Sequence, residues 1–166
     1  MHAVSVGETL AAAQFVKQFM VQNPDTPVII TSTTPTGSEQ VKRIFGERVF
    51  HMYLPYDLPS FINRFIKSIR PGALVIVETE LWPNLLACCD QHDLPVVLAN
   101  ARMSERSARG YGKVPALTRP MLHSLNIVAV QNPTDGQRFI ELGLPTGRLK
   151  VTGSVKYVVT LPEGCH

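Results

Sequence analysis

The 166-residue sequence has no run of about 18 consecutive apolar residues, the length that a membrane-spanning helix needs. Its start lacks the basic and then apolar pattern of a secretory signal. The net charge of +3 is too small to indicate a nucleic-acid-binding protein. With 45% hydrophobic residues, the sequence predicts one soluble globular domain with its own core and no nucleic-acid partner.

Cysteines are few, namely Cys88, Cys89 and Cys165. No Cys-x-x-Cys pair or His-rich spacing accompanies them. Adjacent positions on a helix point about 100° apart, so Cys88 and Cys89 are poorly placed to bind one metal ion together. We expect reduced thiols of an intracellular protein, with no metal site and no cofactor.

Short apolar runs alternate with segments of helical periodicity along the chain. The first strand is expected near residues 2–6, and the others over 27–32, 48–54, 73–77, 95–99, 127–130 and 149–153. Helices are expected over 10–22, 39–45, 57–70, 83–91, 114–123 and 132–143. The alternation predicts an α/β fold, a Rossmann-like parallel sheet with helices on both faces. Asp57 or a near neighbour is expected to cap the helix over 57–70.

The first turn differs from that of nucleotide-binding Rossmann domains. No Gly-x-Gly-x-x-Gly and no Gly-Lys-Ser/Thr loop follows the first strand, where the sequence is Ser5-Val6-Gly7-Glu8. Gly7 permits a sharp bend and a close approach by a ligand, and Glu8 enters the helix at the ligand-binding edge of the sheet. A carboxylate there argues against a bound pyrophosphate. Acidic residues are also common in first helical turns, because the helix dipole favours them, so a structural role stays open.

Charged residues follow two more strands at the same edge. Glu78 and Glu80 come after the strand over 73–77, and in an extended chain they would point to the same side. Carboxylates there suit a general base, although capping a helix or binding an Arg is the structural alternative. Arg102 opens a basic run after the next strand. It either clamps a phosphate or carboxylate or belongs to a solvated helix face.

Hydroxyl side chains gather after the strand over 27–32. Residues 33–38 are expected to form a turn in which Thr34, Thr36, Gly37 and Ser38 offer hydroxyl and N–H groups to a phosphate or sugar. A plain turn into a capped helix is the alternative interpretation.

Six segments, in this order, closely resemble the 3-deoxy-D-manno-oct-2-ulosonic acid (Kdo) transferases of lipopolysaccharide synthesis. They are Ser5–Thr9, Thr34–Glu39, Leu54–Asp57, Glu78–Asn84, Asn100–Ser104 and Thr152–Lys156. The resemblance runs from about residue 2 to about residue 157. It implies a GT-B glycosyltransferase, a class with two Rossmann-like halves across a cleft. Residues 1–157 then form the amino-terminal, acceptor-binding half, and 158–166 are a tail or the start of the interdomain linker.

The resemblance also implies a reaction and its partners. The family moves Kdo from CMP-Kdo to a lipid A precursor, with inversion, at the cytoplasmic face of the bacterial inner membrane. The donor-binding half and a membrane anchor are expected outside this sequence, so the fragment alone should be inactive. No metal or cofactor is implied.

Site residues carry over from the resemblance position by position. Glu8 matches the proposed general base and Glu80 a second essential acid, while Glu78 shares the motif of Glu80. The substrate-binding positions are Gly7, Thr34, Thr36, Gly37, Ser38, Glu78, Arg102 and Lys156. After Tyr157, Val158 and Val159 depart from the family's acidic pattern.

Two other functions compete with this interpretation. One is the acceptor domain of a different GT-B glycosyltransferase, and the other is a non-catalytic module that binds an anionic lipid. Three acids would repel such a lipid unless one of them acts as a base. Convergence of Glu8, Glu78 and Glu80 on one cleft would therefore favour the enzyme.

Overall fold

The computed structural model of the chain describes residues 1–2 and 6–153, and the side chains of α1 from residue 13 onward. The strands are β1 (Ile29–Ser32), β2 (Phe50–Tyr53), β3 (Leu74–Val77), β4 (Val96–Ala101), β5 (Ile127–Val130) and β6 (Leu149–Val151). The α-helices are α1 (Val6–Gln22), α2 (Pro35–Phe45), α3 (Pro59–Ile69), α4 (Pro83–Gln91), α5 (Glu105–Gly112), α6 (Pro115–His123) and α7 (Pro133–Glu141).

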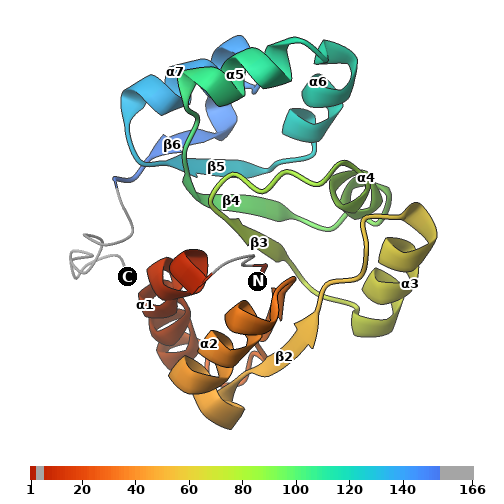
Figure 1. Cartoon of the computed structure of the whole chain (residues 1–166), viewed down its shortest axis with the longest axis vertical. Helices are drawn as coiled ribbons and strands as arrows, with labels where there is room; N and C mark the ends of the chain where they lie inside the picture. Colours follow the sequence, from red (N-terminus) through yellow and green to blue (C-terminus); the bar gives the residue numbers. More distant parts are fainter. Residues whose placement is uncertain (3–5, 154–166) are drawn as a thin grey trace.

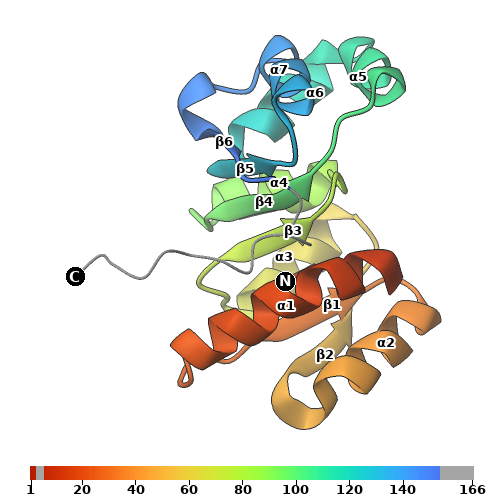
Figure 2. The ribbon, with the colours of Figure 1, turned by 90° about the vertical axis from the view of Figure 1, so that its left-hand side faces the viewer.

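The strands form a parallel sheet around His2. β1 pairs with β2, the strands β3 to β6 pair in sequence order, and each of these pairings is parallel. His2 connects the two sets, because it bridges Thr31 of β1 on one side and Ile76 of β3 on the other. Figures 1 and 2 show this stack from two sides, with β6 at the top and β2 at the bottom. The chain order reverses at His2, which makes the space beside it the switch point where Rossmann-like folds bind ligands.

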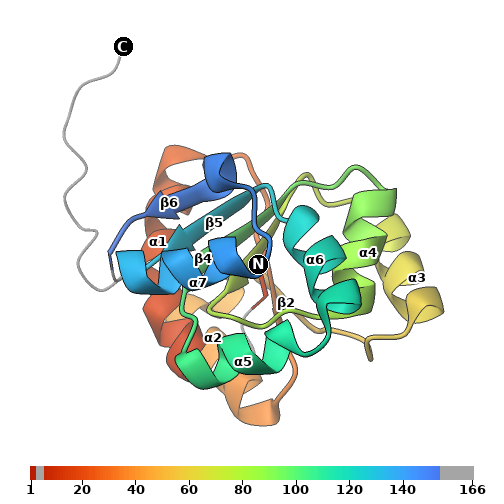
Figure 3. The ribbon, with the colours of Figure 1, turned by 90° about the horizontal axis from the view of Figure 1, so that it is seen from above.

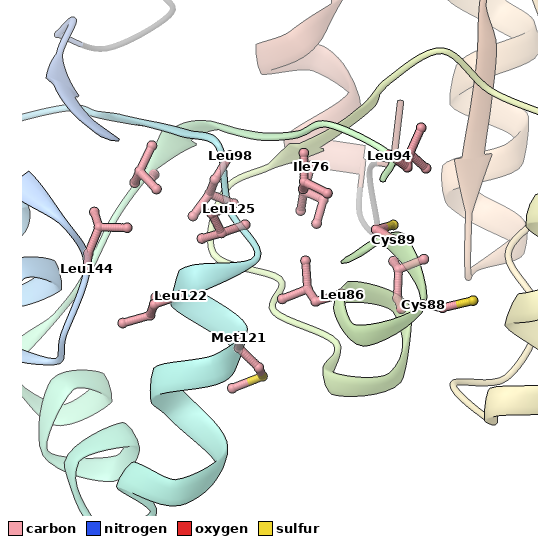
Figure 4. Close-up of a cluster of buried hydrophobic side chains, with 14 of the residues drawn as sticks. Ile76, Leu86, Cys88, Cys89, Leu94, Leu98, Met121, Leu122, Leu125 and Leu144 are labelled. Atoms are coloured by element: carbon pink, nitrogen blue, oxygen red, sulfur yellow. The ribbon is translucent and has the colours of Figure 1, made fainter. Parts of the chain in front are cut away.

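Two separate hydrophobic cores cover the sheet. The smaller joins α1 and α2 to β1 and includes Val16, Ile30 and Phe45. The larger joins α3, α4, α6 and α7 to strands β3 to β5, and Figure 4 shows its centre, with Leu86, Leu98 and Leu122 converging. Figure 3 shows α3, α4 and α6 gathered beside the strands. The predicted α/β fold with a parallel sheet and flanking helices is thus confirmed.

Proline stands at the start of five of the described helices, and the first, second and fifth helices differ most from expectation. Pro35, Pro59, Pro83, Pro115 and Pro133 stand at the first positions of their helices, where a missing N–H costs nothing. α4 begins and ends as predicted, and Asn132 caps α7 as predicted by accepting from the N–H of Asp135. The Thr-Pro pair at 34–35 is the same kind of signal, which the turn interpretation of 33–38 overlooked.

The first and fifth helices also correct the sequence-based boundaries. α1 begins at Val6, so Gly7 lies inside the helix and not in a preceding turn. Glycine is compatible with either conformation, so its identity could not decide between them. α5 lies outside the expected helical ranges and begins where the Ser104 hydroxyl accepts from the Ser107 N–H and caps the helix.

Candidate functional site

The segments after β3 and β4 lie against each other at the carboxyl edge of the sheet. The N–H of Glu78 donates to the carbonyl of Ala99 at 2.8 Å. The Thr79 hydroxyl bonds to the Arg102 carbonyl and accepts from the Arg102 N–H, the latter at 3.1 Å. The structure therefore brings together two regions that the sequence placed at one edge, with the exposed Arg102 beside the acidic segment.

Both strands end in left-handed backbone. Glu78 has φ 61° and Asn100 has φ 56°, and the β4–β5 register shifts between Leu98 and Ala101. Asn tolerates this region, whereas Glu is strained there by about 1 kcal/mol or more. The chain is thus not extended at Glu78. Strand alternation therefore no longer predicts that Glu78 and Glu80 point to the same side.

Glu80 accepts a hydrogen bond from an aromatic neighbour. Its side chain is half-buried, and its Oε2 accepts from the Trp82 indole N–H at 3.3 Å. Tyr111 of α5 lies close enough that burial and the Glu80 charge raise the pKa of its phenol, burial being the larger cause. Sequence reasoning missed Tyr111, because its distance of 31 positions from Glu80 carries no periodic signal.

Asp57 connects the loop after β2 to the start of α4. Its carboxylate accepts from the N–H of Leu85 at 2.8 Å and of Asn84 at 3.1 Å, and the Asn84 amide donates to the Asp57 carbonyl at 2.7 Å. Asp57 was expected near the cap of α3, but the cap of that helix is Leu58, without a side-chain hydrogen bond. Asp57 thus caps a helix distant in sequence, the one that follows the Glu80 segment.

Removing this cap should destabilise the protein measurably. Asp57→Ala leaves two helical N–H groups of α4 without their acceptor, so we expect a loss of about 2 kcal/mol. Urea unfolding of the variant is the measurement, with Asp57→Asn expected to lose less. Replacing the exposed Asp25 by Ala is the control and should change stability by under about 0.5 kcal/mol. Equal stabilities of the two alanine variants would contradict the capping role.

Residues 35–38 form the first turn of α2, which corrects the turn expected over 33–38. Thr34 caps α2 by accepting from the Gly37 N–H at 3.1 Å, and Gly37 and Ser38 are buried, whereas Thr36 is exposed. His51 of β2 lies between two serines, with Ser32 Oγ 2.9 Å from Nε2 and Ser38 Oγ 3.4 Å from Nδ1. Burial and then the nearby Lys42 charge lower the pKa of His51. Gly37 and Ser38 therefore position α2, and Thr36 is the member most open to a ligand.

The remaining predicted site residues are described only in part. Gly7 and Glu8 lie in the first turn of α1, which follows His2 at the switch point. The side chain of Glu8 and all of Lys156 lie outside the described residues. Convergence of the three carboxylates is accordingly untested, and the base at Glu8 stays a prediction.

The described part of the chain holds neither a cluster of metal-binding side chains nor a helix able to span a membrane. It contains no group of three or more His, Cys, Asp or Glu side chains that could hold a metal ion. Cys88 and Cys89 are buried and free, with sulfur atoms pointing in different directions (Figure 4). Burial raises the pKa of the Cys89 thiol to about 12. None of the described helices has both the length and the apolarity to cross a bilayer.

One pocket lies away from these residues. It is a mainly apolar pocket of about 460 Å³ at the amino ends of β1 and β3, lined by residues such as Phe15, Phe19, Ile69 and Leu74. None of its described lining residues is acidic. The chemistry-bearing groups are therefore at the opposite end of the strands.

Comparisons of sequence identify the relatives of the chain. A family model described as 3-deoxy-D-manno-octulosonic-acid transferase (kdotransferase) matches residues 1–159. A 3-deoxy-D-manno-octulosonic acid transferase of Haemophilus influenzae is 45% identical over 157 residues, which cover 95% of this chain and 37% of that protein. The transferase of Bordetella pertussis is 37% identical over 98% of this chain and 38% of its own length.

Solved structures with a similar fold are more distant in sequence. A UDP-GlcNAc 2-epimerase from Neisseria meningitidis bound to UDP-GlcNAc has a TM-score of 0.66 at 14% identity, over 93% of this chain and 47% of that one. A putative UDP-N-acetylglucosamine 2-epimerase from Listeria monocytogenes has a TM-score of 0.67 at 13% identity, over 99% of this chain and 48% of that one. These likenesses show the fold alone.

Proposed function

Since the chain belongs to the 3-deoxy-D-manno-octulosonic acid transferase family, we propose that it is the acceptor-binding half of an inverting glycosyltransferase that moves Kdo from CMP-Kdo to a lipid A precursor. The chain spans less than two-fifths of the curated relatives it matches, which leaves room in a complete enzyme for a donor-binding half. The observation that carries the proposal is the family match over residues 1–159, together with Glu80 and Arg102 at the switch-point edge.

Glu8 acts as the general base in this proposal. An acceptor hydroxyl attacks the anomeric carbon of Kdo while the bond from that carbon to the CMP phosphate breaks, and Glu8 takes the hydroxyl proton. General-base assistance of this kind contributes about 10²–10⁴-fold to a rate. We assign Glu80, which accepts a hydrogen bond from Trp82, to the same reaction zone, and Gly7 and Glu78 to its lining.

Arg102 and the exposed Thr36 supply contacts to the anionic substrates. A guanidinium binds a phosphate through two parallel hydrogen bonds, and lipid A precursors carry phosphate. Lys156 is assigned to the crossing into the donor-binding half.

An apolar edge supports contact with the membrane surface that holds the acceptor. Tyr56 is 82% exposed, and Tyr53, Leu58 and Phe61 beside it are each at least 50% exposed. Clustered apolar exposure of this kind indicates an interaction surface. The complete enzyme is thus proposed to work at the cytoplasmic face of the bacterial inner membrane.

The test is a transfer assay on an extended protein, defined as this chain completed by the part of the Haemophilus influenzae relative that it does not match. We expect transfer of Kdo from CMP-Kdo to a lipid A precursor, and none from UDP-sugars. The 166-residue chain alone should transfer nothing. Transfer from a UDP-sugar instead would overturn the donor assignment in favour of another glycosyltransferase, and acceptor binding without any transfer would favour the lipid-binding module.

A further inference from the structure

Trp82, the single tryptophan of the sequence, lies between Glu80 and the centre of the sheet. Its indole N–H donates to Glu80 Oε2 at 3.3 Å. On the other side, the rings of Trp82 and His2 meet edge to face, with centroids 5.4 Å apart and planes at 77°. His2 Nδ1 in turn lies 2.9 Å from the Thr31 hydroxyl of β1. These contacts run from Thr31 of β1 through His2 and Trp82 to the Glu80 carboxylate.

His2 is an unusual residue for its position. Its side chain is fully buried, and Nε2 has no hydrogen-bond partner among the described residues. A buried polar atom without a partner destabilises a protein, and an aliphatic residue at the centre of a parallel sheet would avoid that cost. The edge-to-face contact with Trp82 is a favourable interaction that an aliphatic residue would not provide. His2 therefore fixes the ring that binds Glu80.

We propose that Trp82 is a positioning residue for Glu80, held in its orientation by His2 and Thr31. This inference rests on the proposed function of Glu80. A glutamate side chain has three rotatable bonds, and a hydrogen bond to one carboxylate oxygen restricts them before the substrate arrives. Pro83, at the first position of α4, fixes the backbone directly after Trp82.

The hydrogen bond between Trp82 and Glu80 can be tested without a transfer assay. Because the chain has one tryptophan, a ¹H–¹⁵N spectrum of the 166-residue protein contains one indole N–H signal. Glu80→Ala should shift that signal, since the acceptor is removed. The matched control Glu47→Ala, an exposed glutamate of the 3-10 helix Gly46–Arg48, should leave it in place. If Glu80→Ala leaves the indole N–H signal unshifted, the proposal is overturned, whether or not the extended protein transfers Kdo.

The functional test compares rates in the extended protein. Trp82→Phe keeps an aromatic ring against His2 and removes the N–H, so kcat should fall about 10-fold, as for one hydrogen bond to a charged group, with KM unchanged. In a Glu80→Ala background the same substitution should change kcat less than about 2-fold. A 10-fold loss in both backgrounds would indicate a merely structural role and overturn the proposal. Absence of transfer by the unmodified extended protein would instead refute the proposed function and leave the indole result standing.

Discussion

Glu8→Gln in the extended protein should lower kcat for Kdo transfer by about 10²–10⁴-fold. The substitution keeps the size and the hydrogen-bonding oxygen of the side chain but removes its capacity to take a proton. Acceptor and donor KM should change little, because the lost interaction belongs to the transition state. A steady-state assay with CMP-Kdo and a lipid A precursor measures both constants.

Two controls make the result specific. Glu47→Gln makes the same chemical change at an exposed position of the 3-10 helix Gly46–Arg48 and should retain full activity. The Glu8→Gln variant of the 166-residue chain should unfold at nearly the same urea concentration as the original chain, since a first-turn carboxylate contributes only about 0.3–1 kcal/mol. If Glu8→Gln transfers Kdo at close to the original rate, the base lies elsewhere and Glu80 is the next candidate.

The stability of the 166-residue chain should rise from pH 4 to pH 8. Burial lowers the pKa of His2 from 6.5 to about 4, helped by the Met1 charge and opposed by the Thr31 hydrogen bond. Burial likewise lowers the pKa of the Met1 amine from 8.0 to about 6, where it donates to the Ile29 carbonyl. At pH values between the folded and unfolded pKa of each group, the unfolded chain binds more protons than the folded chain. The free energy of unfolding therefore increases with pH.

Between its folded and its unfolded pKa, each group should raise the free energy of unfolding by on the order of 3 kcal/mol. Urea unfolding at intervals between pH 4 and 8 measures the sum. Acetylating Met1 should remove the rise between pH 6 and 8, together with part of the His2 effect that depends on the Met1 charge. His2→Leu should remove most of the rise between pH 4 and 6.5, and the remainder belongs to His51, whose pKa is also lowered. A flat profile in the unmodified chain would show that neither group is buried uncharged.

The sequence determined the order and type of most elements. The apolar runs at 73–77 and 127–130 became β3 and β5, and the Asn132-Pro133 and Pro83 signals became helix starts. Such signals are local, because a missing N–H or a capping oxygen acts within one helical turn. The sequence also placed the Glu78–Glu80 segment and Arg102 at one edge, since the carboxyl ends of parallel strands coincide.

Tertiary structure alone decided which side chains meet across that edge. Asp57 reaches a helix start 27 positions later, and Trp82 touches a histidine 80 positions earlier. Left-handed backbone at Glu78 interrupts the strand alternation from which the direction of its side chain was predicted. These contacts depend on where the loops cross in space, and residue type and spacing carry no information on that until the sheet has formed.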